Sequence, residues 1–347
     1  MTVRIGVGLF TGQVPTGSDR SFAQEYRDTL ELVRLAESLG FDSAWVSEHH
    51  GASDGYLPSL LVMLAAFAEA TSRIRLGTGL ILTPFHDPLR LAEDAAVVDQ
   101  LSGGRLTIGV GMGWREEEFR MFGLPMRERL PRTVETIEIL RRAWTGERFS
   151  FEGEIFRYDR VRVTPPAAQA GGPPILLGGY VDAALRRAGG IADGHITDAD
   201  DLAHVRTAIS GMRDGAHAAG RDPERLHLVL MANAFVAEER AWDVARPGVL
   251  HQWGAYEAWS EGHDTPEHDS LEAIVTDEHA ARRATAAGRP DEVTHALEPA
   301  MRSLGARAEA DLIVRLHYPG MAYDDAARAV RLFGERVLPA LRAADPS

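Results

Sequence analysis

Short apolar runs alternate with amphipathic stretches along most of the chain. The first run, VRIGVGLF at 3–10, is followed by YRDTLELVRLAESLG at 26–40, whose apolar residues recur at helical spacing and end at a glycine. A helical pattern follows nearly every later run as well. The runs that predict strands lie at 3–10, 42–49, 74–82, 106–113, 174–179, 194–197, 226–237 and 311–317.

Eight buried strands that alternate with helices predict a parallel sheet with helices packed on it. Eight such repeats favour a closed (β/α)₈ barrel, the TIM barrel fold, formed by one domain that spans 1–347. An open, doubly wound sheet is the alternative, although eight strands would be many for it.

Two stretches are longer than the minimal repeat requires. Residues 145–166, TGERFSFEGEIFRYDRVRVTPP, show strand-like alternation around a Glu-Gly turn and predict a β-hairpin inserted beside the barrel. Residues 240–290 combine aromatic and acidic side chains and are too long for a simple connection. This segment predicts a lid-like insertion over the substrate. The alternatives are a mobile surface loop and a contact between subunits of an oligomer.

The amino-acid composition excludes several classes of function. The net charge is −14 and there is no cysteine. The charge argues against a nucleic-acid or anionic-membrane surface, and the missing cysteine excludes disulfides, thiolate catalysis and Cys-ligated metals. We find no signal-peptide pattern and no apolar run near 18 residues, so a cytoplasmic protein is expected.

The motif VSEHH at 46–50 stands at the end of the second predicted strand. Active sites of (β/α)₈ barrels lie at the carboxyl ends of the strands, so Glu48, His49 and His50 are expected there. Neighbouring strand residues point to opposite faces, which makes a metal site shared by the two histidines unfavourable. The other histidines near predicted strand ends are His86, His195 and His317.

Three interpretations of His49 stay open. It completes a metal site with histidines from other strand ends, it serves as an acid/base or hydrogen-bond donor, or it only satisfies backbone groups. We favour the second and expect no metal.

The order of several motifs is specific although each alone is weak. FDSAWVSEHH, IRLGTGLILTPFHDPLRLAEDAAVVDQLSGGRLTIGVGMGW and EEEFRMFG, followed by PPILLGGYVDAALRRAGGIADGHI, GRPDEV and LIVRLHYPGM, resemble the bacterial luciferase-like family of flavin-dependent oxidoreductases. The resemblance covers essentially the whole chain except parts of 240–290. It implies the same (β/α)₈ fold.

The resemblance also implies roles for individual residues. His49 matches the family's catalytic histidine beside the flavin, and Glu48 matches the acidic residue before it. The dipeptide Gly79-Leu80 matches one that often adopts a cis peptide bond against the isoalloxazine ring.

The flavin phosphate is expected at the turn formed by Gly178, Gly179 and Tyr180, between a strand and a helix amino terminus. The sequence departs from the family at Asp182, where relatives often carry Ser or Thr, because an acid there repels phosphate unless it turns outward.

The end of the fourth strand is smaller and less basic than in well-known relatives. Gly111 and Met112 replace a cysteine and a phosphate-binding arginine, respectively. Arg132 matches the family's phosphate-contacting arginine, and Arg129 competes for this role.

The implied activity is two-component monooxygenation. A separate NAD(P)H-dependent flavin reductase supplies reduced FMN, which reacts with dioxygen on a small-molecule organic substrate. Aromatic residues expected near the strand ends favour a mostly apolar substrate; they are Phe10, Phe85, Trp114, Trp253 and Tyr256. Relatives are often homodimers through the helices that follow the second and third strands, and a homodimer is expected here.

Three other functions are considered. A branch of the same superfamily transfers hydride with a deazaflavin coenzyme instead of FMN, and the EHH triplet favours FMN. A metal-dependent barrel hydrolase is disfavoured because the first strand carries no histidine pair. A non-catalytic flavin-binding or structural subunit is disfavoured by the intact His49.

Overall fold

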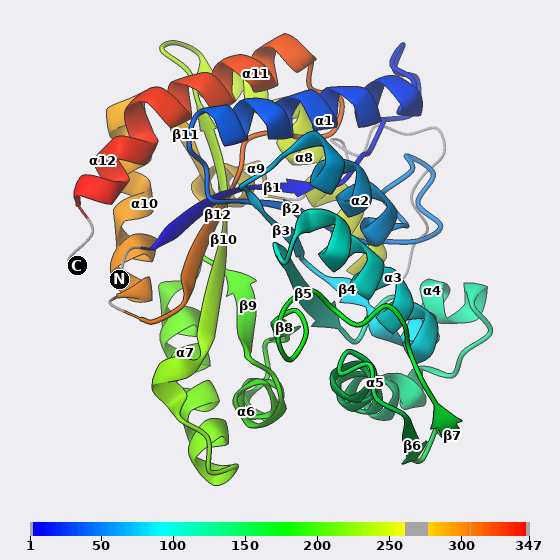
Figure 1. The fold of residues 1–347 in the computed structure, drawn as a ribbon. Helices are drawn as coiled ribbons and strands as arrows, with labels where there is room; N and C mark the ends of the chain where they lie inside the picture. Colours follow the sequence, from blue (N-terminus) through cyan, green and yellow to red (C-terminus); the bar gives the residue numbers. More distant parts are fainter. Residues whose placement is uncertain (1–2, 261–276, 306, 345–347) are drawn as a thin grey trace.

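The computed structural model describes residues 3–260, 277–305 and 307–344. Eight parallel strands close on themselves in the order β1, β2, β3, β5, β8, β9, β10 and β12, because β12 returns to pair with β1 (Figure 1). The predicted (β/α)₈ barrel is confirmed, and the open doubly wound sheet is wrong. The strands are β1 Arg4–Phe10, β2 Ser43–Val46, β3 Arg75–Thr78, β5 Leu106–Gly111, β8 Ile175–Gly178, β9 Gly194–Asp198, β10 His227–Val236 and β12 Ala310–Arg315.

Two further strands extend the sheet outside the closed barrel. β4, Ile81–Leu82, pairs with the end of β5. β11, Thr285–Gly288, pairs with the carboxyl end of β10 from Asn233 to Val236. The sequence pattern did not predict β11, which lies inside the 240–290 segment.

Helices cover the outside of the barrel, with α1 and α11 on one side and α6 and α7 on another (Figure 1). They are α1 Phe22–Ser38, α2 Leu60–Ala70, α3 Pro88–Ser102, α4 Glu116–Met121, α5 Arg129–Ala143, α6 Asp182–Ile191, α7 Leu202–Ala218, α8 Ala241–Ser260, α9 Glu278–Arg283, α10 Pro290–Leu304, α11 Tyr323–Leu332 and α12 Leu338–Ala343. No helix among the described residues is long and apolar enough to traverse a bilayer.

The long helical region expected from Glu116 to Trp144 is divided in the structure. α4 ends at Met121, and Gly123 then adopts a φ of 65°, a left-handed conformation that favours glycine. A short 3₁₀ turn after Pro125 leads into α5. We call the carboxyl ends of the strands the barrel mouth. Because of the break, α4 lies over the mouth, whereas α5 packs along the outside of the barrel.

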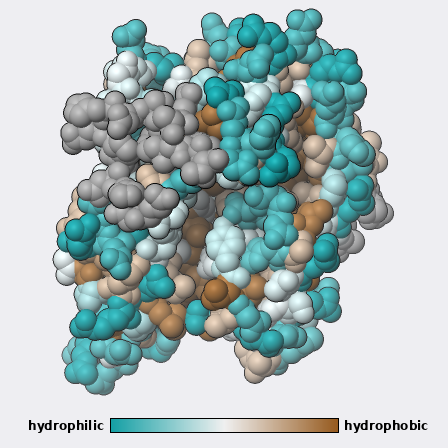
Figure 2. Space-filling model, turned by 180° about the vertical axis from the view of Figure 1, so that it is seen from behind, coloured by the Kyte–Doolittle hydropathy of each residue, from teal (hydrophilic) through white to brown (hydrophobic). Residues whose placement is uncertain are grey.

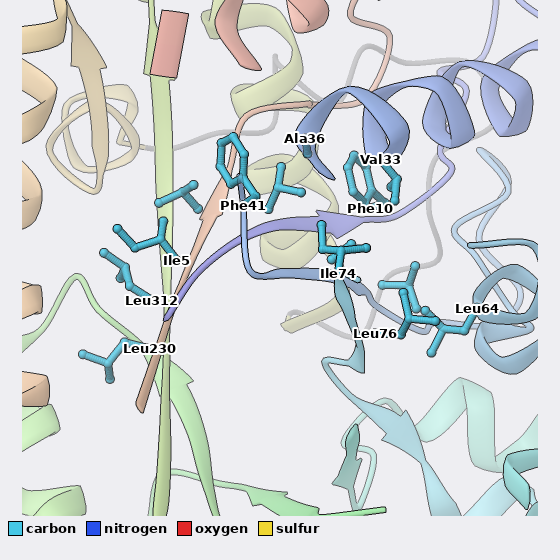
Figure 3. Packing of buried hydrophobic residues seen from close by; sticks show 14 of the residues in the cluster. Ile5, Phe10, Val33, Ala36, Phe41, Leu64, Ile74, Leu76, Leu230 and Leu312 are labelled. Carbon is cyan, nitrogen blue, oxygen red and sulfur yellow. The ribbon is translucent and has the colours of Figure 1, made fainter. Parts of the chain in front are cut away.

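The apolar core has two layers because successive strand residues point to opposite faces. The outer layer lies between strands and helices and includes Ile5, Leu76, Leu230 and Leu312 (Figure 3). The inner layer fills the barrel with Leu9, Trp45, Leu176, Ile196, Val229 and Ile313. Polar residues cover most of the surface seen from behind, and apolar residues gather toward its middle and lower part (Figure 2).

A polar cluster closes the barrel at the amino-terminal ends of the strands. The carboxylate of Asp311 accepts hydrogen bonds from Arg4 Nη2 at 2.7 Å and from Ser43 Oγ at 3.3 Å, and His227 Nε2 lies 2.6 Å away. Burial raises the pKa of Asp311, but the hydrogen bonds of His227 and Arg4 outweigh this effect and hold it at about 2. The cluster lies at the opposite end of the barrel from the mouth.

Residues 145–166 contain the antiparallel pair β6, Phe149–Glu152, and β7, Arg157–Val161. The buried carboxylate of Glu135 on α5 accepts hydrogen bonds from three consecutive backbone N–H groups of the turn, at residues 154, 155 and 156. This carboxylate therefore fixes the hairpin against α5.

Candidate active site

The VSEHH motif leaves the barrel at the mouth. β2 ends at Val46, so Glu48, His49 and His50 lie in the loop directly after the strand and not on the strand itself. All three are nonetheless buried, with exposed fractions of 2%, 5% and 7%. The loop folds back over the mouth because the backbone N–H of Leu57 donates to the carbonyl of Thr11, after β1.

The imidazole of His49 is held at both nitrogens. Nδ1 lies 2.9 Å from Oε1 of Glu118 on α4, and Nε2 lies 3.3 Å from the hydroxyl of Tyr256 on α8. A carboxylate only accepts, so the neutral ring carries its proton on Nδ1 and directs the lone pair of Nε2 toward Tyr256. The ring also packs against Tyr56 and Trp259, each with centroids 4.8 Å away.

Glu118 is a site residue that the sequence reasoning missed. Its Oε1 accepts from His49, from the backbone N–H of His50 at 2.9 Å and from Arg115 Nη1 at 3.3 Å. Its Oε2 is buried and has no hydrogen-bond partner among the residues that the structure describes. The available signal was the EEEF stretch, in which helical spacing exposes Glu116 and buries Glu118.

Glu48 makes a second carboxylate–histidine pair that turns away from His49. Its Oε1 lies 2.8 Å from Nε2 of His50 and 3.1 Å from Nε2 of His86. Burial raises the pKa of Glu48, but the hydrogen bonds of both histidines outweigh burial and lower it. Burial alone would lower the pKa of His86, but the hydrogen bond with Glu48 outweighs burial. The pKa of His86 is therefore raised. Glu48 thus contacts His50 and His86 and not His49, and it holds the VSEHH loop against His86.

A chain of hydroxyl groups continues from His49. The hydroxyl oxygens of Tyr256 and Tyr56 are 3.2 Å apart, and Tyr56 donates to Oγ of Ser47 at 3.1 Å. Burial raises the pKa of both tyrosines, so both hydroxyls stay protonated at neutral pH and can pass a proton between neighbours.

Aromatic residues expected near the strand ends divide into two groups. Trp114 stacks on Tyr256 with centroids 6.3 Å apart, and Phe85 lies 5.6 Å from the His50 ring. Phe10 instead belongs to the outer core, and Trp253 packs against that core. The prediction that these two line the mouth is therefore wrong, because both turn toward the helices.

Leu80 enters the barrel through a gap that glycines leave. The Gly79-Leu80 peptide bond is cis. A Cβ at Gly178 would lie 2.3 Å from Leu80 Cδ1, and a Cβ at Gly111 would lie 3.1 Å from the same atom. Gly111 and Gly178 therefore make room for the Leu80 side chain. Met112, the residue after Gly111, is half-buried.

The turn from β8 to α6 suits an anion. Gly179 adopts a φ of 143°, and the N-cap residue Val181 offers no side-chain hydrogen bond, so helix N–H groups there are available to a ligand. Asp182 turns along the helix and pairs with Arg186 at 2.9 Å, away from the turn. The Tyr180 hydroxyl donates to the carboxylate of Asp198 on β9.

Arg129 and Arg132, the two candidates for contact with the flavin phosphate, make different contacts. Arg132 pairs with Glu128 at 2.8 Å and packs over the ring of Phe156. Arg129 Nη1 lies 3.4 Å from the carbonyl of Gly113, just beyond β5. Arg129 is thus the arginine whose guanidinium reaches the strand ends.

The histidines at other strand ends do not join His49. His86 pairs with Glu48, His195 Nδ1 lies 2.6 Å from the carbonyl of Leu177, and His317 faces Glu25 at 3.5 Å. Burial lowers the pKa of His195 to about 4, which keeps it neutral. Across the described residues, no cluster of three or more His, Asp or Glu side chains has an arrangement that holds a metal ion.

Comparison with known proteins defines the class. Residues 3–308 match the luciferase-like monooxygenase family, and the chain belongs to this family. It is 33% identical over 334 residues to an F420-dependent glucose-6-phosphate dehydrogenase from Nakamurella multipartita, covering 91% of this chain and 93% of that protein. It is 30% identical over 318 residues to a 4-hydroxyprotoasukamycin monooxygenase from Streptomyces nodosus subsp. asukaensis, covering 87% and 84%.

A solved structure agrees with this assignment. Monooxygenase RslO1 from Streptomyces bottropensis superimposes with a TM-score of 0.82 at 29% identity, covering 97% of this chain and 99% of that chain. The predicted family is confirmed. Its members include both monooxygenases and F420-dependent dehydrogenases, so the chain belongs to a family of oxidoreductases.

Proposed function

We propose that the protein is a flavin-dependent monooxygenase that uses reduced FMN and dioxygen on a small, mostly apolar organic substrate. The observation that carries the proposal is the enclosed His49, whose two nitrogens meet Glu118 and Tyr256. The likeness of the whole chain to a monooxygenase structure supports it. The rings of Trp114 and Trp259 around His49 suit an apolar substrate and exclude water.

The residues at the mouth fit FMN. The Gly178-Gly179-Tyr180 turn and the α6 amino terminus would hold its phosphate, because Gly179 leaves the backbone open and Asp182 points away. Arg129 would supply the nearby positive charge, and the backbone of Gly79-Leu80 with Gly111 and Met112 would lie against the flavin ring. Bound reduced FMN would supply the electrons that activate dioxygen.

In this proposal His49 moves a proton at Nε2. Glu118 keeps the proton of the neutral ring on Nδ1, so Nε2 is free to accept from a reacting group or from Tyr256. The hydroxyls of Tyr256, Tyr56 and Ser47 then relay the proton away from the reacting centre. Glu48 contributes indirectly by orienting His50 and His86.

We also propose a separate NAD(P)H-dependent flavin reductase as a partner. The glycine-rich GVGMGW stretch that comes closest to a nicotinamide-binding fingerprint is the end of β5 and the loop after it. It leads to the six-residue α4 and does not form a strand-to-helix turn around a pyrophosphate. Reduced FMN would therefore arrive from another protein.

A deazaflavin-dependent hydride transfer is the second candidate. The 33% identity to an F420-dependent dehydrogenase over 91% of the chain favours it. The His49–Glu118 pair suits this chemistry too, because Nε2 can accept the hydroxyl proton of an alcohol as its carbon loses hydride. The same residues would then act as general base and orienting carboxylate.

Anaerobic titration separates the two candidates. Purified protein is titrated with reduced FMN and, in a second experiment, with reduced coenzyme F420, while tryptophan fluorescence reports binding; air is then admitted. Tight FMN binding followed by oxygen-dependent flavin spectral changes supports the monooxygenase. Binding of F420 alone, with no oxygen-dependent change, overturns it in favour of hydride transfer.

A further inference from the structure

A buried arginine lies at the mouth end of the barrel interior. Arg315 is the last residue of β12. Along this strand Leu312 and Val314 belong to the outer core and Ile313 to the inner core, so strand alternation directs Arg315 inward. Its partner in the parallel ladder, Asn233 of β10, points to the same side.

The guanidinium of Arg315 has no ionic partner among the described residues. The residue is 7% exposed, and its Nε is buried without a hydrogen-bond partner. The buried carboxylate of Asp198 on β9 accepts a hydrogen bond from the Tyr180 hydroxyl. Burial raises the pKa of Asp198, and the positive charge of Arg315 opposes this rise without forming an ion pair with it. A buried guanidinium that lacks an ion pair and a full set of hydrogen bonds is unfavourable, so a ligand that supplies them would stabilise it.

Arg315 acts on the same residues that surround His49. Burial raises the pKa of Tyr56 and of Tyr256, and the positive charge of Arg315 opposes this in both. Tyr256 contacts His49 directly. Arg315 is therefore within electrostatic range of Tyr56 and Tyr256, the two tyrosines whose rings contact His49.

The order of strands separates Arg315 from the proposed phosphate turn. β12 and β2, which precedes His49, have only β1 between them. β9 and β10 both lie between β12 and β8, where the phosphate turn is. Along the barrel wall, Arg315 is thus on a strand nearer to β2 than to β8.

We propose that Arg315 binds a carboxylate of the substrate and so selects small, largely apolar acids. This inference deepens the proposed function and rests on it for the identity of the reacting molecule. A planar guanidinium matches a carboxylate with two parallel hydrogen bonds, and a single arginine balances one negative charge. The aromatic rings near His49 would pack against the apolar part of the same molecule.

Binding of benzoate without any flavin tests the inference. Wild-type protein, Arg315→Met and Arg336→Met are titrated at constant ionic strength with benzoate, with its neutral analogue benzamide and with inorganic phosphate, while tryptophan fluorescence is followed. Arg336 is an exposed arginine on the helical segment after α11, and it serves as the matched control. We expect benzoate to bind wild type and R336M equally and R315M at least about tenfold more weakly, with benzamide equally weak on all three.

Thermal unfolding keeps the test independent of misfolding. Because Arg315 forms no ion pair within the described part of the chain, replacing it with the similarly long, apolar Met is expected to leave the Tm unchanged or to raise it by about 2 °C or more. A large fall in Tm would show that Arg315 has a structural partner and would overturn the inference.

The other outcomes are equally decisive. Benzoate that binds R315M as tightly as wild type, or wild type that does not prefer benzoate to benzamide, overturns the inference. Phosphate that binds wild type as tightly as benzoate and loses this affinity in R315M overturns the carboxylate assignment. Wild type that prefers benzoate but binds neither FMN nor F420 leaves the anion site standing and refutes the proposed function instead.

Discussion

His49 and Glu118 are separated by 69 positions in the chain, yet Nδ1 of the imidazole and Oε1 of the carboxylate lie 2.9 Å apart in a buried setting. β2 delivers the histidine and α4 delivers the glutamate, and the two meet over the barrel mouth. The pair fixes which nitrogen of the neutral His49 ring carries the proton, and leaves Nε2 toward Tyr256.

Replacement of His49 by Ala is expected to reduce product formation by about 10²-fold or more while leaving cofactor binding nearly unchanged, because the residue moves a proton and does not hold the phosphate. Single-turnover product yield and a fluorescence titration with cofactor measure the two effects. His295, an exposed histidine on α10, provides the control His295→Ala. An unchanged yield in H49A would remove His49 from the mechanism.

Glu118→Gln is expected to lower both activity and stability. The amide keeps the shape but loses the negative charge that faces His49 and Arg115, at a cost of about 1–3 kcal/mol. Urea unfolding and steady-state rates measure the change. The exposed Glu116 of the same helix gives the control Glu116→Gln, which should behave as wild type. Equal stabilities and rates for the two variants would contradict the assigned role of Glu118.

Gly178→Ala is expected to weaken FMN binding by about tenfold, or 1.4 kcal/mol. The new methyl group would lie 2.3 Å from Leu80 Cδ1, so Leu80 must move toward the surface on which the flavin is proposed to lie. Gly190→Ala in α6 is the control, because its methyl group has its closest contact at 3.7 Å. Unchanged affinity in G178A would show that Leu80 does not define the flavin surface.

The Asp311 cluster predicts a loss of stability in acid. The pKa of Asp311 is about 2 in the folded chain, below its ordinary value near 4, so its contribution is complete above about pH 4 and disappears as the pH falls toward 2. The contribution is about 2 kcal/mol. Urea unfolding of wild type and Asp311→Asn should show a gap at pH 7 that narrows below pH 4. A gap independent of pH would refute the linkage.

The predicted homodimer has an apolar surface available on α2 and α3, which pack side by side. Val62 is 73% exposed on α2, and Val97 and Leu101 on α3 are 44% and 52% exposed. Val62→Glu is expected to convert the dimer to a monomer with little effect on the fold, as light scattering and circular dichroism can measure. Thr207→Glu on α7 is the control. A dimer that survives V62E places the interface elsewhere.

The barrel was predictable because its strands are buried on both faces and therefore appear as continuous apolar runs. All eight runs became barrel strands. β11 was not predictable in the same way, since TAAG is short and made of small residues whose strand conformation comes from pairing with β10. The break between α4 and α5 was missed because amphipathic spacing continues across it, although Gly123 and Pro125 signalled it.

The site was predicted in part. Motif order pointed to His49 and the two glycine turns, whereas contacts between distant segments, such as Glu118 with His49, leave no mark in local spacing. Phe10 and Trp253 were placed at the mouth by position in the chain, and only the packing shows that they turn outward. Arg315 looked like an ordinary strand residue, because the burial of its Nε without a hydrogen bond to any described residue is visible only in three dimensions.

β10 is ten residues long and has two neighbours in succession on one side. Its first part, Leu228 to Asn233, pairs with β12, and its last part, Asn233 to Val236, pairs with β11. The chain between β10 and β11 therefore departs from and returns to the same strand, beyond the point where the barrel closes. Because β11 pairs with β10 only from Asn233 onward, a change in the length of this connection is expected to leave the register of the eight barrel strands unchanged.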